Sequence, residues 1–186
     1  MHGPVHGARS WLAPVFLAGC CAAAPIAFAE GHPHEHGVAR VEVAVEGSAV
    51  NVRLDSPLDN LVGFERAPRN DAERKRVDAA LRLFDRGGKL FAVDPAAQCK
   101  LQAVELSSQV LKLGPPGEPD PDGHAELAAD FHFHCARAEH AGFVETDLFA
   151  AFPRVQRIDA QAVTAKAQRE VTLQRPHRRI PLGPGE

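Results

Sequence analysis

The sequence predicts an α+β fold: a mainly antiparallel β-sheet with one clear helix and one long hairpin stapled by a disulfide. Three observations predict it: two alternating apolar runs near the start, one stretch with helical periodicity, and two cysteines that flank a turn-rich segment. With 186 residues, of which 45% are apolar, the chain is long enough to bury a core as a single domain.

Residues 1–29 have the features of an export signal. An apolar run interrupted by prolines ends in the small-x-small sequence Ala-Phe-Ala at 27–29, so cleavage there would leave Glu30 as the first residue. The sequence around Cys20 also has the form of a lipoprotein signal, in which that cysteine carries the lipid. Both interpretations place the folded part outside the cytoplasm, either soluble in the periplasm or anchored to the membrane through Cys20.

The first alternating pattern predicts a β-hairpin over residues 38–54. Apolar residues occupy every second position on both sides of a Gly-Ser turn, in the series Val41, Val43, Val45, Val50, Val52 and Leu54. Pro57 is expected to end the second strand, because proline has no N–H to donate to a ladder. Residues 58–68 are apolar without a clear period, which favours a short turn or helical piece packed on the sheet.

The clear helix is expected at about 71–84. Asn70 or Asp71 can cap its first turn, and apolar residues recur on one face, namely Val77, Ala80, Leu81 and Phe84. Glycines 87 and 88 are expected to end the helix in a left-handed conformation. A short strand is expected next, over residues 89–94.

The long hairpin is predicted from residues 99–113 and 125–135, which flank a segment rich in proline and glycine. Symmetric pairing about residue 117 brings Cys99 opposite Cys135, since each cysteine is 18 residues from that point (117 − 99 and 135 − 117). An even pair of cysteines outside the cytoplasm favours a disulfide. The sequence therefore predicts a Cys99–Cys135 bond at the base of this hairpin.

The last part of the chain predicts two more strands, over residues 155–164 and 170–173. Residues 175–186 contain three prolines and little apolar content, so a frayed tail is expected there. The predicted organisation is thus a signal peptide at 1–29, a flexible histidine-containing segment at 30–37, a single domain at 38–174 and the tail.

Two histidine clusters are the strongest chemical signal. His32, His34 and His36 follow the leader at alternate positions, and His132 and His134 share one face of the strand that ends at 135, with the phenylalanines between them on the other face. Imidazole nitrogens suit Zn²⁺, and a flexible segment that closes over the strand would bring the clusters to one metal ion. The alternative is that all these histidines are ordinary surface residues.

Two further metal ligands follow from position. His124, in the loop of the long hairpin, is a candidate extra ligand. If the chain begins at Glu30, then Glu30-Gly31-His32 offers an α-amine, two amides and an imidazole, a four-nitrogen square suited to Cu²⁺ or Ni²⁺.

Other function classes have little support. The net charge is −3 without a basic block, so nucleic acid is not an expected partner. No His-Glu-x-x-His helix, glycine-flanked serine or phosphate loop is present, so the protein is not expected to be an enzyme. A non-enzymatic interaction module with incidental histidines, and a metal-dependent hydrolase with an open coordination position, are the alternatives.

Four sequence features together resemble the ZrgA-like family of exported proteins. They are His-Glu-His-Gly-Val-Ala at 34–39, Asn-Leu-Val-Gly-Phe-Glu-Arg-Ala-Pro at 60–68, the cysteine pair, and Asp-Leu-Phe-Ala-Ala-Phe-Pro at 147–153. The resemblance implies a periplasmic zinc-binding protein of zinc uptake, which works beside an ABC-type importer and is not an enzyme. It carries over to His34, His36 and the strand with His132 and His134.

This chain departs from the family pattern at two places. The hairpin loop is short and proline-rich, with His124 as its only histidine, where many members have a long tract of His, Asp and Glu. Arg66 stands where the family often has histidine, so a ligand role at that position is lost.

Overall fold

The structure, a computed structural model, describes residue 3 and residues 35–115 and 125–183. Residues Pro33–Glu186 belong to one compact unit. Apart from Gly3, the predicted leader and its Cys20 lie outside the described residues. Within the described part, no helix is long and apolar enough to cross a membrane.

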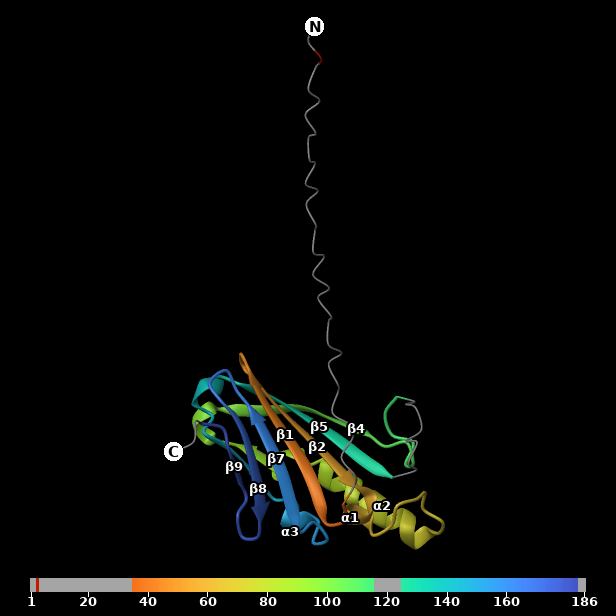
Figure 1. Cartoon of the computed structure of the whole chain (residues 1–186). Helices are drawn as coiled ribbons and strands as arrows, with labels where there is room; N and C mark the ends of the chain where they lie inside the picture. The colour runs from red at the N-terminus through yellow and green to blue at the C-terminus, as the bar shows by residue number, and fades with distance from the viewer. Residues whose placement is uncertain (1–2, 4–34, 116–124, 184–186) are drawn as a thin grey trace. The chain divides into compact units, whose positions relative to one another are not determined.

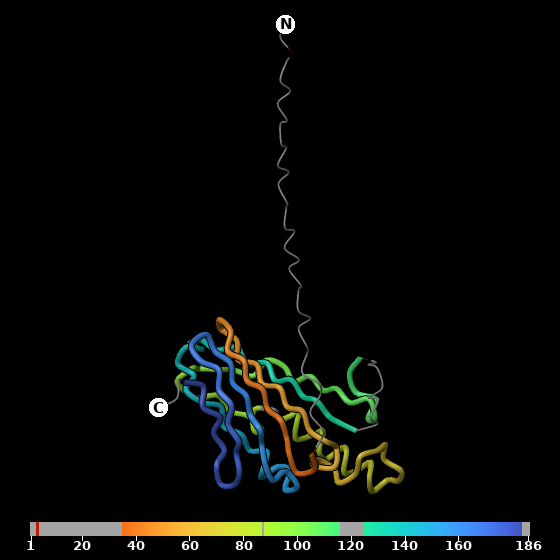
Figure 2. Tube along the Cα trace, in the orientation of Figure 1, coloured from red at the N-terminus to blue at the C-terminus, as the bar shows by residue number. Residues whose placement is uncertain are grey.

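A six-stranded sheet forms the body of this unit, and it confirms the predicted fold class (Figure 1). The strands follow the order β4 (Cys99–Ser107), β5 (Glu126–Cys135), β2 (Ala49–Pro57), β1 (Val38–Glu46), β7 (Arg157–Val163) and β8 (Gln168–Gln174). Neighbouring strands run antiparallel except β1 and β7, which run parallel. Figure 2 shows this pairing as an orange segment from the start of the chain beside a blue one from its end.

The predicted hairpin is β1 and β2. Its turn contains Gly47 at a φ of 56°, a left-handed value that glycine adopts without strain. The alternating apolar residues all face the core, and Val43 and Val52 are 1% exposed. Strand β2 runs three residues beyond the predicted hairpin, because Pro57 takes the last position, where a missing N–H costs no ladder bond.

The predicted helix is α2 (Asp71–Phe84), capped as expected by Asn70, whose side chain accepts from the backbone N–H of Glu73. The expected left-handed glycine at its end is wrong: the C-cap is Asp85 in a right-handed conformation, and a short 3₁₀ helix, η1 (Gly87–Lys89), follows. The short helical piece before it is α1 (Leu58–Val62), which ends at Gly63 with a φ of 86°.

The core lies on the inner face of the large sheet. Phe131 of β5 is fully buried there, 4.9 Å from the ring of Phe91 and 6.4 Å from that of Phe84 on α2 (centroid to centroid). Phe133 and Cys135 face the same side, so His132 and His134 face outwards. The alternation predicted for this strand is therefore confirmed.

The disulfide between Cys99 and Cys135 is present, and the two residues are direct partners in the β4–β5 ladder. The register shifts by one residue between Leu101 and Ala103, where a bulge interrupts β4. The pairing predicted from symmetry is thus confirmed at the cysteines. Beyond the bulge, each residue of β4 pairs one position away from the symmetric partner.

A second sheet of three strands was not predicted. It contains β3 (Phe91–Val93), β6 (Phe143–Thr146) and β9 (Arg179–Pro181). Short helices stand between the strands, namely η2 (Pro95–Ala97), η3 (Ala138–His140) and α3 (Leu148–Ala151). The expected frayed tail is wrong for 179–182, because β9 pairs with β6 and Ile180 is fully buried.

Candidate metal site

The outer face of β5 presents the predicted histidine pair. His132 is half-buried and His134 is exposed. Two residues along a strand separate their Cα atoms by about 7 Å. The residues beside His134 on the adjacent strands are Ala49 and Lys100, so a small side chain borders it on one side.

His132 is oriented by a hydrogen bond. Its Nδ1 lies 3.0 Å from Oδ1 of Asn51, its partner on β2. An amide oxygen accepts, so Nδ1 is the donor here, and in the neutral imidazole Nε2 is then the nitrogen with the lone pair. Metal-binding histidines are commonly held in this way, by a donor bond from the nitrogen that does not bind the metal.

His36 lies just before β1, in a turn closed by a bond from the N–H of Val38 to the carbonyl of Glu35. Gly37 has a φ of 82° and donates its N–H to Oδ1 of Asn60 at 2.7 Å. The imidazole Nε2 of His36 lies 2.9 Å from Oε1 of Glu65. The described end of the flexible segment predicted at 30–37 is therefore attached to the domain.

His36 and the pair of His132 and His134 lie at opposite ends of the sheet. Through β2, Arg40 on β1 is level with Ala128 on β5. From Ala128, His132 lies four residues along β5 in one direction. From Arg40, Val38 lies two residues along β1 in the opposite direction, and His36 precedes it. At 3.3–3.4 Å per residue the separation is about 20 Å or more. The expected meeting of His36 with the strand pair at one metal ion therefore does not occur in the structure.

Sequence reasoning missed the partners of His36. Asn60 and Glu65 belong to the motif at 60–68, and the structure shows that this motif contacts the His-Glu-His-Gly motif directly. The contacts join residues 23 and 29 positions apart, so no local pattern predicted them. The co-occurrence of the two motifs in the family resemblance was the available signal.

Arg66, at the position where the family often has histidine, stabilises the fold through an ion pair. Its guanidinium binds both carboxylate oxygens of Glu73 at 2.7 and 2.9 Å and lies over the ring of Phe64. The hydrogen bond from Arg66, with one from the N–H of Arg69, lowers the pKa of Glu73 from 4.5 to about 2. This ion pair connects the segment after α1 to the first turn of α2.

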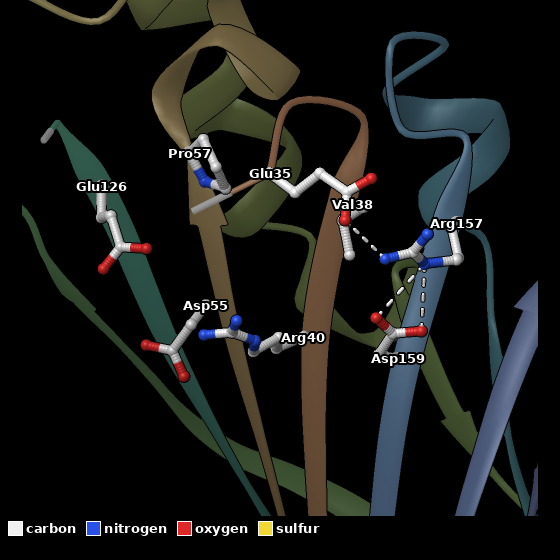
Figure 3. Close-up of a pocket in the computed structure, with 8 residues that line it drawn as sticks. All are labelled: Glu35, Val38, Arg40, Asp55, Pro57, Glu126, Arg157 and Asp159. Carbon is white, nitrogen blue, oxygen red and sulfur yellow. Dashed lines mark hydrogen bonds and ion pairs between the residues drawn. The ribbon is translucent and has the colours of Figure 1, made fainter. Parts of the chain in front are cut away.

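A small pocket lies at the start of β1, and ion pairs among the side chains that line it connect Glu35, the residue before His36, to β7 (Figure 3). Arg157 lies between Glu35 and Asp159, at 2.8 and 3.2 Å, and the hydrogen bond that it donates to Glu35 is the main cause of a raised pKa for this arginine. The guanidinium of Arg40 turns towards Asp55. The residues that line the pocket are mostly charged and several are ion-paired, so we interpret it as an ion-pair network.

The remaining predicted ligands are His32, His34 and His124, which lie outside the described residues, as does Glu30. His140 and His177 are exposed, as expected for surface residues. Within residues 35–115 and 125–183, no three His, Cys, Asp or Glu side chains are grouped closely enough to hold a metal ion. The metal-binding roles of the histidines therefore stay predictions.

Comparison with known proteins decides the family. The family model described as "ZrgA family zinc uptake protein" matches residues 33–182. The chain belongs to the ZrgA family. The match covers both sheets and both histidine-bearing sites of the described structure, and it supports a role in zinc uptake with Zn²⁺ as the ion. Among curated proteins, none matches the chain.

Proposed function

We propose that this ZrgA family member captures Zn²⁺ in the periplasm and passes it towards an ABC-type importer, without catalysing a reaction. The family match supports zinc as the cargo. The observation that carries the proposal for the site is the hydrogen bond between His132 and Asn51, which leaves Nε2 free to bind metal on the same face as His134.

The chemistry of this site suits capture and release. Two imidazoles on a rigid strand bind Zn²⁺ with nitrogen ligands, and water or a receiving protein can fill the other positions of its tetrahedron. An ion held by few protein ligands is exchanged more easily than one in a closed four-ligand site. A protein that hands zinc to a transporter needs such an exchange.

Isothermal titration with Zn²⁺ tests the site. We expect the double variant His132→Ala/His134→Ala to lose one binding event, or at least tenfold in affinity. The matched control is His140→Ala/His177→Ala, which removes two exposed histidines elsewhere and should titrate like the unchanged chain. Equal Zn²⁺ affinity and stoichiometry in all three proteins would contradict the proposal that His132 and His134 bind zinc.

Location and cargo need separate measurements. We expect the protein in the periplasmic fraction, with zinc as the metal found by elemental analysis. Intact mass distinguishes a chain that begins at Glu30 from one lipidated at Cys20. A chain that begins at Cys20 excludes the Cu²⁺ or Ni²⁺ site at Glu30-Gly31-His32.

A further inference from the structure

The contact between His36 and Glu65 has the features of a built chelating pair. The two side chains come from segments 29 residues apart, and His36 Nε2 lies 2.9 Å from Glu65 Oε1. Their side chains are 66% and 28% exposed, so a hydrated ion can reach both. His36 also lines an open depression of about 400 Å³ at the start of β1.

The backbone on the His36 side is fixed before any ion binds. Gly37 donates to Asn60, and its carbonyl accepts from the N–H groups of Gln156 and Arg157 at the start of β7. Asn60 is buried, and its amide also donates to the carbonyl of Val38. The backbone that carries His36 therefore loses little conformational entropy when an ion binds.

The Glu65 side is fixed as well. Gly63 turns the chain after α1, and Arg66, the residue next to Glu65, is held by Glu73 and by the ring of Phe64. Both halves of the pair are thus held by contacts that do not involve the facing side chain.

The pair is now spaced as a hydrogen bond from Nε2 to the carboxylate, so zinc must replace that proton and open the pair. With Zn–N of 2.0–2.1 Å, Zn–O of 2.0–2.2 Å and a tetrahedral angle, the two ligand atoms are about 3.4 Å apart. The pair at 2.9 Å therefore needs to open by about 0.5 Å. The Cα atoms of His132 and His134 are about 7 Å apart, so those side chains must bend to share one ion.

Two of the nearby arginines are paired with carboxylates, whereas Arg175, which lines the same depression as His36, donates to the carbonyls of Phe149 and Pro153. Arg157 is paired with Glu35 and Asp159, and Arg66 is paired with Glu73. The carboxylate of Glu65 supplies the charge that complements a divalent cation.

We propose that His36 and Glu65 form a second Zn²⁺ site, with water in the remaining positions, at the end of the sheet opposite His132 and His134. Zinc as its ion rests on the proposed function. The position of the site rests on the geometry of the pair alone.

The test uses the full chain with His132→Ala/His134→Ala as the background, so that the first site is silent. We expect Zn²⁺ titration to show residual binding that falls at least tenfold in His36→Ala, Glu65→Ala and Glu65→Gln. The glutamine variant keeps the hydrogen-bonding ability and shape of the side chain, so a loss of Zn²⁺ binding in this variant is not expected to come from a folding defect. Far-UV circular dichroism checks that it is folded. The matched control is Glu139→Ala/His140→Ala, which removes an exposed His–Glu pair at 3.6 Å and should leave binding unchanged.

Imidazole resonances provide a second measurement. On addition of Zn²⁺ the nitrogen shifts of His36 should move, and those of His140 should not. Loss of binding in His36→Ala with none in either Glu65 variant overturns the role of Glu65. No binding by the background protein overturns the second site and leaves the proposed function intact, whereas no binding by the unchanged chain overturns both.

Discussion

Asn51 determines which nitrogen of His132 faces outwards. The amide accepts from Nδ1, and the cross-strand pairing of β2 with β5 places the two side chains opposite each other. Without this bond the imidazole can rotate or exchange its proton between the two nitrogens. Asn51 is thus a positioning residue for the proposed site.

Asn51→Ala should therefore weaken Zn²⁺ binding about tenfold, since loss of such supporting bonds typically costs 10–100-fold in affinity. Asn51→Asp should retain or strengthen it, because a carboxylate accepts the same proton. Titration calorimetry measures both, with Gln161→Ala on the same outer face as the control. Unchanged affinity in Asn51→Ala would contradict the positioning role.

Glu73 gives a pH-dependent contribution to stability. Its folded pKa of about 2 lies below the ordinary 4.5, so the carboxylate stabilises the fold above pH 4.5, and this stabilisation is lost as the pH falls towards 2. Glu73→Gln should lower the free energy of unfolding at pH 7, and the difference from the unchanged chain should narrow between pH 4.5 and 2. Urea denaturation at a series of pH values measures this. A difference that is constant with pH would show that the ion pair with Arg66 is not its source.

Individual side chains were predictable from sequence only where a local period determined them. The outward direction of His132 and His134 followed from strand alternation, and the cap at Asn70 followed from its place before a helical pattern. The contacts of His36 with Glu65 and of Gly37 with Asn60 join separate segments, so they depend on how the elements pack.

At the scale of elements, the hairpin of β4 and β5 depends on its disulfide. The bond closes a loop of 36 residues and joins an edge strand to the strand that carries His132 and His134. Cys99→Ala/Cys135→Ala should lower the free energy of unfolding by about 2–5 kcal/mol. Urea denaturation measures it, and the unchanged chain under reducing conditions should show a similar loss. A change under 0.5 kcal/mol would mean that pairing alone holds the hairpin.

Strand β9 supplies a second test. Because Ile180 is fully buried, Ile180→Ala should cost about 2–5 kcal/mol, as for other buried large-to-small changes. Val163→Ala is the control, since Val163 is 46% exposed and its change should stay within about 0.5 kcal/mol. Thermal or urea unfolding distinguishes them. Equal, small effects would restore the frayed tail that the sequence predicted.

The sequence could not reveal β9 because it has three residues, the last of them Pro181, which are too few to show a period. Ile180 and Leu182 alternate, but the pattern is too short to distinguish from a loop, and its partner β6 is a four-residue strand. Elements of this size are stabilised by tertiary contacts. The longer elements, above all β1, β2 and α2, were predictable because each has nine or more residues, which is long enough for its apolar series to show a period.

At the scale of the whole domain, the sheet separates the two proposed zinc sites. Sites about 20 Å apart without shared ligands should act independently. The losses in Zn²⁺ binding free energy from His36→Ala and from His132→Ala/His134→Ala should therefore add in the combined variant, within about 0.5 kcal/mol. Calorimetry of the three variants measures this. A combined loss no larger than either single loss would support one shared site instead.

The fold class was predictable from composition and pattern, whereas the order of strands was not. Alternation shows that a segment is a strand and which of its faces is buried, but it does not show which other strand it pairs with. The parallel pairing of β1 with β7 left no local trace, because no tight turn joins the two strands.

That parallel pairing also constrains when the domain can form. Val38 pairs with Arg157, so the two strands meet only after nearly the whole chain is available, and such non-local pairing is slow. The turn that carries His36 needs the same partner, because the N–H groups of Gln156 and Arg157 bind the carbonyl of Gly37. During synthesis, the segment that carries His36 would emerge early and yet be among the last parts of the chain to reach its folded position.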